Sequence, residues 1–328
     1  MNRRLSRCLL MVALTAFAAV AAPIAAHAQA WPAKPITLLV PFPPGGGTDA
    51  FARPLSAQLT KQLGRQVIID NRGGAGGTVG ASVAAKAAPD GYTFFIGAVH
   101  HTIAPSFYLK LDYDIEKDLV PMTTIANPPQ VIVVNPGRVA AQDLRSFLDY
   151  ARKNPGKINY ASAGNGTSHH LAGEFFKQMS KTFMVHIPYR GAGPALQDLI
   201  AGNVDVMFDG LGSSAQHLRG NRIRALAVAA PNRVAAFPNL PTTAEAGLPG
   251  YEVSTWYAIW AVKGTPKEII DRMYDEVVKA LSSPELREMW TNNGSELAVM
   301  KQEDFARFVG AEIKRWAEVT KTSGARLD

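Results

Sequence analysis

Two segments rich in glycine and hydroxyl residues have the composition of an anion-binding site. Residues 41–49 read PFPPGGGTD, and residues 161–170 read ASAGNGTSHH. Each follows a short apolar run typical of a strand and precedes a run with helical periodicity. Glycines let the backbone approach a ligand closely, and a helix start offers unpaired N–H groups with a partial positive charge. Two such segments facing each other could hold a carboxylate without any arginine.

Simpler and enzymatic interpretations of the same residues stay open. In the first segment, Thr48 or Asp49 could merely cap the following helix. In the second, Ser162 could be the nucleophile of a secreted hydrolase, with one of the two following histidines as its base. That interpretation is weakened because residues 160–164 fall one position short of Gly-x-Ser-x-Gly and no acid is identifiable to orient the base. Asp209 follows a strand-like run, and it either faces the same site or is an ordinary turn residue.

Nucleotide-binding loops are disfavoured by their spacing. No Gly-Lys-Ser/Thr follows residues 41–49. In the stretch 72–80, Gly74-x-Gly76 is followed by Val79 where the third glycine of a dinucleotide fingerprint should stand. We therefore expect no nucleotide and no other cofactor.

The histidine pairs His100-His101 and His169-His170 lie in loops expected near these segments. Four histidines suggest a metal, but adjacent residues on one element point apart, and neither pair has the i, i+4 spacing of a helical zinc site. We expect no metal, and we expect one or two of these rings to donate to a bound carboxylate. A histidine that touches an anion is favoured in its protonated form, so affinity is expected to weaken as the pH rises through about 6 to 8.

The hydrophobic periodicity predicts two α/β units that position these segments. Strand-like and helical runs alternate from residue 36 to residue 97, and the order βαβαβ implies a mostly parallel sheet flanked by helices. A second unit of the same kind starts near residue 131 and ends near residue 229. A strand near residues 254–262 and two further helices follow. We expect this tail to fold back onto the first unit, which makes two chain crossings and a two-stranded hinge.

The first 30 residues have the pattern of a secretory signal peptide. Arg3, Arg4 and Arg7 precede an apolar stretch, and Ala-His-Ala-Gln-Ala stands before Trp31, so cleavage is expected after Ala28 or Ala30. The only cysteine, Cys8, would leave with this segment. No later segment is apolar enough to span a membrane. The formal net charge is +7, but lysines and arginines are scattered and form no basic run interleaved with aromatic residues, which disfavours nucleic acid as a partner.

Six motifs, taken in this order, resemble the Bug-type receptors of tripartite tricarboxylate transporters. They are residues 41–49, 74–80, 88–92, 160–171, 191–194 and 223–227. The similarity covers nearly the whole chain after the signal peptide. It implies the two-lobed α/β fold of periplasmic binding proteins, similar to type II, with a two-stranded hinge. Lobe 1 is then expected to comprise residues 31–127 plus 257–328, and lobe 2 residues 128–256.

The resemblance also implies which residues hold the ligand. A carboxylate is expected to bind mainly through main-chain amides and hydroxyl groups of both segments, and Asp209 is expected to contact the ligand's far end. The residues carried over from the family are Phe42, Pro44, Gly46, Thr48, Asp49, Ser162, Ala163, Gly164, Thr167, Ser168 and Asp209. The family often has small hydroxyl residues where this chain has His100 and His101. This departure could favour another dicarboxylate or an aromatic acid over citrate or an acidic amino acid.

Together these features predict a periplasmic solute-binding protein that is not an enzyme. It is expected to be a monomer that closes its lobes around a di- or tricarboxylate, an acidic amino acid or an aromatic acid. It would then deliver the ligand to the membrane permease of a tripartite tricarboxylate transporter. A sensory receptor with a signalling partner and a secreted serine hydrolase are the alternatives.

Overall fold

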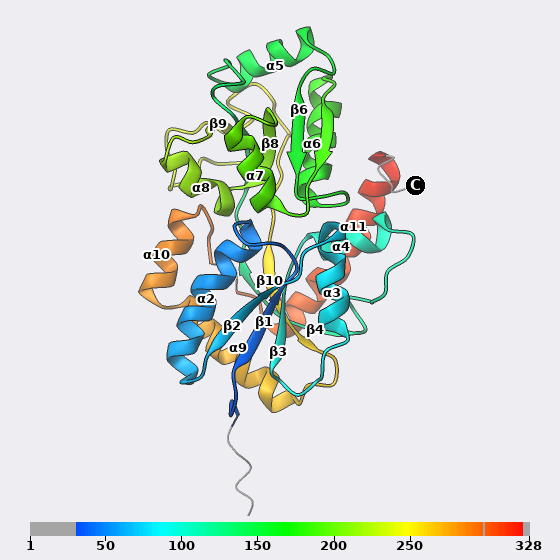
Figure 1. The fold of residues 1–328 in the computed structure, drawn as a ribbon, viewed down its shortest axis with the longest axis vertical. Coiled ribbons are helices and arrows are strands. Elements are labelled where there is room, and N and C mark those ends of the chain that lie inside the picture. The colour runs from blue at the N-terminus through cyan, green and yellow to red at the C-terminus, as the bar shows by residue number, and fades with distance from the viewer. Residues whose placement is uncertain (1–30, 298, 324–328) are drawn as a thin grey trace, which may run out of the picture. The chain divides into compact units, whose positions relative to one another are not determined.

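In the part of the chain that the computed structural model describes, residues 31–297 and 299–323, two five-stranded sheets form the frame (Figure 1). The first sheet has the order β2-β1-β3-β10-β4, and the second has the order β7-β6-β8-β5-β9. The first sheet consists of β1 Ile36–Val40, β2 Val67–Asn71, β3 Thr93–Ala98, β4 Leu119–Ala126 and β10 Tyr257–Val262. The second consists of β5 Gln130–Val134, β6 Asn159–Ser162, β7 Val185–Pro188, β8 Val206–Gly210 and β9 Arg224–Val228. The expected signal peptide, residues 1–30, lies outside the described residues.

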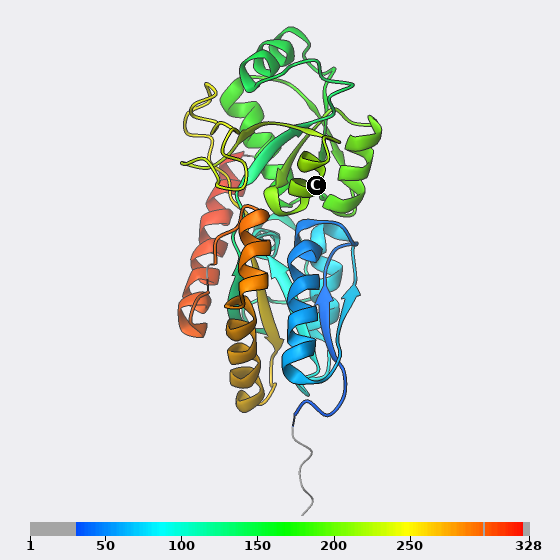
Figure 2. The same cartoon turned by 90° about the vertical axis from the view of Figure 1, so that its left-hand side faces the viewer.

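Helices connect the strands and cover both sheets (Figure 2). Those of the first half are α2 Gly47–Leu63, the short 3-10 helix η1 Ala75–Gly77, α3 Thr78–Ala85, α4 His100–Phe107, α5 Leu144–Lys153 and α6 Ser168–Ser180. The later helices are α7 Ala192–Ala201, α8 Leu211–Arg219, α9 Lys267–Leu281, α10 Pro284–Asn292 and α11 Gln302–Ser323. The α/β class with two sheets is therefore confirmed.

Both sheets are mostly parallel, as predicted, with one strand reversed in each. In the first sheet β1 pairs in parallel with β2 and β3, but β10 runs antiparallel to β3 and β4. In the second sheet β6 is parallel to β7 and β8, whereas β5 is antiparallel to β8 and β9. The two reversed strands, β5 and β10, are the ones that directly follow a crossing from the other sheet.

Two crossing segments join the sheets, and they are hydrogen-bonded to each other. One lies between β4 and β5, and the other lies between β9 and β10. The Thr255 N–H donates to the Pro128 carbonyl over 3.1 Å, and the Gln130 N–H donates to the Val253 carbonyl over 2.9 Å. The chain from Lys34 onward forms one compact unit. The lobe boundaries at residues 127/128 and 256/257 therefore stay predictions.

The last helix, α11, is packed into the core of the first sheet. Phe305 is fully buried, and its ring centroid lies 5.1 Å from that of Trp260 in the central strand β10. The indole N–H groups of Trp256 and Trp316 both donate to Glu312 Oε2, over 3.1 and 3.2 Å. The carboxyl end of the chain is thus part of the same hydrophobic core as β1 and β3. None of the described helices is long and apolar enough to cross a membrane.

Phe305→Ala should destabilise the protein by about 3–5 kcal/mol, because it leaves a cavity among tryptophan rings that cannot collapse onto it. The free energy of unfolding, measured in urea by tryptophan fluorescence, reports the loss. Phe183→Ala is the matched control, since that ring is 59% exposed, and its effect should stay within about 0.5 kcal/mol. Equal effects of the two substitutions would contradict the packing of α11 described above.

Candidate functional site

Helices that begin shortly after strands lie at the carboxyl ends of those strands, where open α/β sheets bind ligands. They include α2 after β1, α4 after β3, α6 after β6, α7 after β7 and α8 after β8. Three of these helices have a glycine at the N-cap position and receive no side-chain cap there: Gly46 before α2, Gly191 before α7 and Gly210 before α8. Their first N–H groups therefore lack the acceptor that a serine, threonine or aspartate would supply at that position.

The start of α2, which follows β1 of the first sheet, lies against the start of α7, which follows β7 of the second sheet. A Cβ atom added to Gly46 would lie 3.4 Å from both Ala192 Cβ and Gly193 N. A Cβ atom added to Gly193 would lie only 2.2 Å from the Pro44 carbonyl oxygen. At Gly193, any side chain would therefore prevent this approach of the two chain segments. At Gly46, which has φ −88°, an added Cβ atom would make only ordinary contacts.

Asp49 faces its own loop and not the opposite segment. Its carboxylate accepts the Gly45 N–H over 3.0 Å, the Arg53 guanidinium over 2.8 Å and the Asn71 side-chain amide over 3.2 Å. The Asn71 amide also donates to the Phe42 carbonyl over 2.8 Å. Asp49 thus fixes the shape of residues 42–46. Thr48, directly before it, is buried at the start of α2.

The second segment is folded by its own hydroxyl groups. Ser162 Oγ accepts the Gly164 N–H over 3.1 Å, and Thr167 Oγ1 donates to the Gly164 carbonyl over 2.7 Å. Gly164 has φ +125°, a conformation that L side chains rarely adopt. Ala163 and Ser168 are buried beside these groups. The predicted residues of this segment are therefore adjacent, and their contact with a ligand stays a prediction.

His186 is a neighbour of this segment that the sequence pattern did not reveal. Its Nε2 lies 2.7 Å from Ser162 Oγ, and its ring stacks on Tyr160 and on His170, with centroids 4.7 and 4.1 Å apart. The contact arises because β7 lies beside β6 in parallel, with Ser162 opposite Pro188. The alternation of β7 could have placed His186 on one face of a strand, but nothing in the sequence fixes which strand lies next to it.

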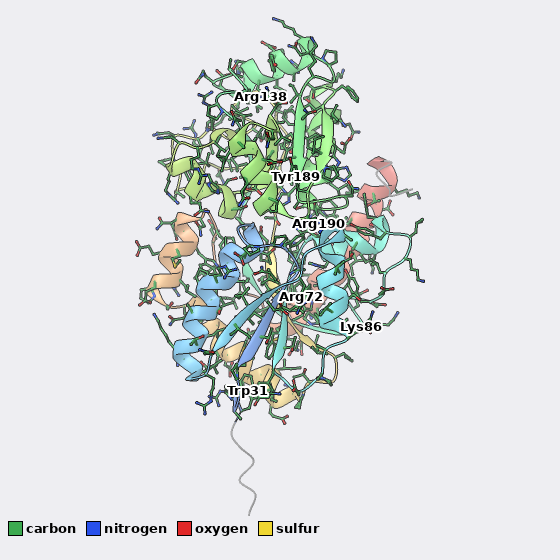
Figure 3. The ribbon with its side chains drawn as sticks, in the orientation of Figure 1. Trp31, Arg72, Lys86, Arg138, Tyr189 and Arg190 are labelled. Atoms are coloured by element: carbon green, nitrogen blue, oxygen red, sulfur yellow. The ribbon has the colours of Figure 1, made fainter. Side chains whose placement is uncertain are left out.

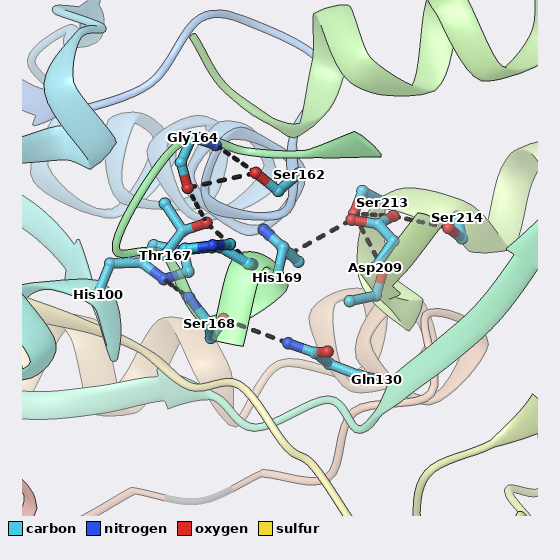
Figure 4. Close-up of polar contacts among 12 residues, drawn as sticks. His100, Gln130, Ser162, Gly164, Thr167, Ser168, His169, Asp209, Ser213 and Ser214 are labelled. Atoms are coloured by element: carbon cyan, nitrogen blue, oxygen red, sulfur yellow. Dashed lines mark hydrogen bonds and ion pairs between the residues drawn. The ribbon is translucent and has the colours of Figure 1, made fainter. Parts of the chain in front are cut away.

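His100 links the two segments, and His101 does not. Both belong to the first turn of α4, and His169 and His170 belong to the first turn of α6, so the expectation that the two pairs lie in loops is wrong. His100 Nδ1 accepts the Ser168 N–H over 3.0 Å (Figure 4). The His100 ring packs edge-on against Phe42 with centroids 5.3 Å apart. His101 turns into the core instead: Nδ1 lies 3.0 Å from the Ala98 nitrogen, and the ring packs edge-on against Phe95.

Burial keeps these histidines neutral. It lowers the pKa of His100 well below its usual range, and His169 and His101 add to this effect through their charge. It also lowers the pKa of His101 to about 4, although hydrogen bonds with Ala98 and Gly77 oppose the shift. Because His100 Nδ1 accepts a backbone N–H, its Nε2 carries the proton and can donate without the ring being charged. The expected loss of affinity between pH 6 and 8 therefore has no cause in His100 or His101.

Asp209 and His169 form a second buried polar pair. Asp209 Oδ2 accepts the hydroxyl groups of Ser213 and Ser214 over 2.7 and 2.6 Å at the start of α8 (Figure 4). Asp209 Oδ1 lies 3.4 Å from His169 Nε2. Burial raises the pKa of Asp209 to about 6, against the hydrogen bonds from Ser214, Ser213 and Gly210, and burial lowers the pKa of His169 to about 4. Asp209 therefore binds two hydroxyl groups in the first turn of α8 through one oxygen and has the other oxygen directed at His169.

No lysine or arginine among the described residues is fully buried. Arg72 and Arg138, which Figure 3 labels, are more than half exposed and pair with Asp70 and Asp205. Among the residues that the structure describes, the buried polar ones include histidines, serines, threonines and aspartates but no lysine or arginine. Nor do the described residues contain a group of three or more potential metal ligands. An anion between the helix starts would thus be held by amides, hydroxyl groups and neutral rings.

Stability should fall as the pH is lowered from about 6.5 towards 4. Over that interval the unfolded chain takes up protons at His100, His101 and His169, whose pKa values are depressed in the folded protein, so unfolding is favoured. Asp209 acts in the opposite sense between about pH 4 and 6, because its pKa is raised in the folded protein. The free energy of unfolding in urea, measured at pH 4.5, 5.5, 6.5 and 7.5, gives the net slope of stability against pH.

His101→Asn removes one of these titrating rings and keeps a hydrogen-bonding group near Ala98. Below pH 6.5, the slope of the unfolding free energy against pH should decrease by the amount that corresponds to the uptake of about one proton. His217→Asn is the control, since that ring is only partly buried and should change the slope less. An unchanged slope in His101→Asn would show that this ring is protonated in the folded protein.

Comparison with known proteins agrees with this geometry. A family model described as "Tripartite tricarboxylate transporter family receptor" matches residues 51–325. A protein of Pseudomonas sp. strain P51, encoded between tcbD and tcbE, is 41% identical over 292 residues, which cover 89% of this chain and 87% of that protein. Protein BugT of Bordetella pertussis is 35% identical over 95% of both chains.

Solved structures with the same fold include the binding protein BugD, at 33% identity and a TM-score of 0.86 over 90% of this chain and 99% of the other. Rpa4515 of R. palustris, solved with adipate, is 37% identical with a TM-score of 0.87, covering 90% of this chain and 100% of the other. MatC of Rhodopseudomonas palustris, solved with malate, is 34% identical with a TM-score of 0.81, covering 88% and 99%. These relatives are solute-binding proteins, so the hydrolase alternative is set aside. The chain therefore belongs to the Bug-type receptor family of tripartite tricarboxylate transporters.

Proposed function

We propose that this protein captures a small carboxylate between its two sheets and delivers it to the membrane permease of a tripartite tricarboxylate transporter. The observation that carries the proposal is the meeting of the α2 and α7 starts, both without a side-chain cap, in a region without buried lysine or arginine among the described residues. Helix starts with open N–H groups bind anions through hydrogen bonds and through the helix dipole.

The solved relatives support a carboxylate as the ligand class. One was solved with adipate and another with malate, which are both dicarboxylates. Each aligns with about nine-tenths of this chain. We infer that the ligand of this chain is a small carboxylate of di- or tricarboxylate, acidic amino acid or aromatic type. We infer further that residues 1–30 direct the protein to the periplasm and that it acts there as a monomer.

The contacts divide the predicted residues into three groups: those proposed to contact the ligand, those that position the loops, and one that belongs to the core. Phe42, Pro44, Gly46, Thr48, His100, Ala163, Gly164, Thr167 and Ser168 line the meeting segments and are proposed to contact the ligand's carboxylate. Asp49 and Ser162 have their side chains committed to the loops, so we assign them to positioning. His101 is assigned to the core. His100 Nε2 is proposed to donate to the ligand while the ring stays neutral.

A thermal-shift screen against mono-, di- and tricarboxylates, amino acids and aromatic acids tests the function. A ligand at 100 times its Kd should stabilise the protein by about 2.7 kcal/mol and raise the Tm accordingly. Gly193→Ala should fold normally, because alanine favours helices, but its Cβ would collide with the Pro44 carbonyl. We expect the variant to bind the best carboxylate at least about tenfold more weakly, since closure would be blocked.

Ala201→Ser, at the exposed far end of the same helix, is the matched control and should bind as the wild type does. Small-angle scattering of Gly193→Ala should also show a larger radius of gyration than the control. If no carboxylate in the screen raises the Tm of the wild type, the proposed function is wrong. If Gly193→Ala binds normally, the meeting of α2 and α7 is not part of the site.

Ser162→Ala should weaken carboxylate binding by about five- to thirtyfold, because the Gly164 N–H loses its acceptor and the segment loses its shape. His186→Phe keeps the ring stack between Tyr160 and His170 but removes the acceptor for the Ser162 hydroxyl. If His186 acts through Ser162, the double variant should bind no more weakly than Ser162→Ala alone. Isothermal titration calorimetry of the wild type, the two single variants and the double variant gives the coupling energy between the two residues. Additive losses of binding free energy would show that His186 has a separate role.

A further inference from the structure

Beside the proposed carboxylate site lies a cluster of buried polar atoms that have no hydrogen-bond partner. Gln130 Oε1, both ring nitrogens of His169 and Asp209 Oδ1 are buried and form no hydrogen bond, although His169 Nε2 and Asp209 Oδ1 face each other at 3.4 Å. The three residues come from the start of β5, the first turn of α6 and the end of β8 (Figure 4). Gln130 lies opposite Gly210 in the β5–β8 pair, directly after Asp209, which places these side chains at one end of the second sheet.

The side chains of Gln130 and Asp209 are each held in place by another contact. The Gln130 amide donates to Ser168 Oγ over 3.2 Å. Asp209 is held through Oδ2 by Ser213 and Ser214. Their unpartnered oxygens are therefore not free to turn towards other groups of the chain, and a buried acceptor without a donor is costly.

Three of these four atoms are hydrogen-bond acceptors, and the fourth, His169 Nε2, faces Asp209 Oδ1. Gln130 Oε1 and Asp209 Oδ1 can only accept while Asp209 is ionised. His169 Nε2 faces Asp209 Oδ1 at 3.4 Å, so the proton of the neutral ring is favoured on Nε2, and Nδ1 is left as an acceptor. A group that fits here must therefore supply hydrogen-bond donors. A second carboxylate would instead meet the buried negative charge of Asp209.

We propose that this cluster reads the far end of the ligand and that the preferred ligand is a small carboxylate whose other end donates hydrogen bonds, as a hydroxyl or an ammonium group does. This inference rests on the proposed carboxylate-binding function and narrows it. Gln130 and His169 are the specificity-determining residues that it adds to Asp209. Malate, adipate and similar dicarboxylates are expected to bind less well than a donor-bearing analogue of the right length.

Four matched series of straight-chain acids with three to eight carbons test the inference. Their far ends carry a methyl, a hydroxyl, an ammonium or a second carboxylate group, and binding is measured by titration calorimetry at pH 7.5. At the best chain length, the hydroxyl or ammonium compound should bind at least about tenfold more tightly than the methyl and carboxylate compounds. The hydroxyl and ammonium series together show which donor is preferred.

Asp209→Asn should reduce this preference, because the amide no longer repels a second carboxylate and can itself donate to one. His217→Asn is the control, since His217 also has a buried ring nitrogen without a partner but lies at the far end of α8, and the preference should be unchanged. If Asp209→Asn does not fold stably, the four acid series measured on the wild-type protein still test the inference.

Tighter binding of the dicarboxylate or of the methyl compound at every chain length would overturn the inference and leave the carboxylate-binding function intact. If no acid of the four series binds although another carboxylate raises the Tm in the screen, the far-end inference is likewise wrong. If no carboxylate of any kind binds, the proposed function itself fails.

Discussion

The structure depends on backbone N–H groups that the chain does not cap. At the starts of α2 and α7, the N-cap residues Gly46 and Gly191 bring no side-chain acceptor. Because these helices belong to different sheets and their starts lie against each other, one acceptor between them could satisfy both sets of amides. Glycine serves two purposes here, since the missing side chain removes the cap and also permits the approach of Pro44 to Gly193. Glycine thus leaves helix N–H groups to which an anion can bind, and it also leaves the space in which the two helix starts meet.

Local patterns predicted the parts of the fold that depend on local physics. Short apolar runs and runs with helical periodicity indicated β1, α2, β6 and α6, and the glycine-rich segments stand between them as expected. The antiparallel entry of β10 into the middle of the first sheet is a long-range pairing that no local run encodes. The start of α4 at His100 was missed because its N-cap residue, Val99, supplies no capping side chain. The proximity of His186 to Ser162 depends on the register of two strands separated by a helix, which the sequence leaves open.

The pair Ser162–His186 has the spacing of a nucleophile and its base, and its surroundings explain why it does not act as one. His186 is packed between the rings of Tyr160 and His170, and burial, with a smaller effect from the charge of His170, lowers its pKa to about 3. A base with such a low pKa takes up a proton poorly near neutral pH. Ser162 is fully buried, and its oxygen already accepts the Gly164 N–H. The short distance between Ser162 and His186 therefore reflects how the loop is folded and not a catalytic role. This agrees with the binding proteins that share this fold.

A buried aspartate is at first sight unfavourable in a receptor for anions, and its position resolves the difficulty. Asp209 precedes α8, where the hydroxyl groups of Ser213 and Ser214 stabilise one of its oxygens, so the positive end of that helix is occupied by the protein's own carboxylate. In the proposed site, the open starts of α2 and α7 would then stabilise the ligand's negative charge. The two ends of that proposed site differ in sign, so a ligand with one carboxylate should bind in a single orientation, with its charge towards α2 and α7. A ligand that reverses would place its carboxylate against Asp209 and leave the amides of α2 and α7 without an acceptor.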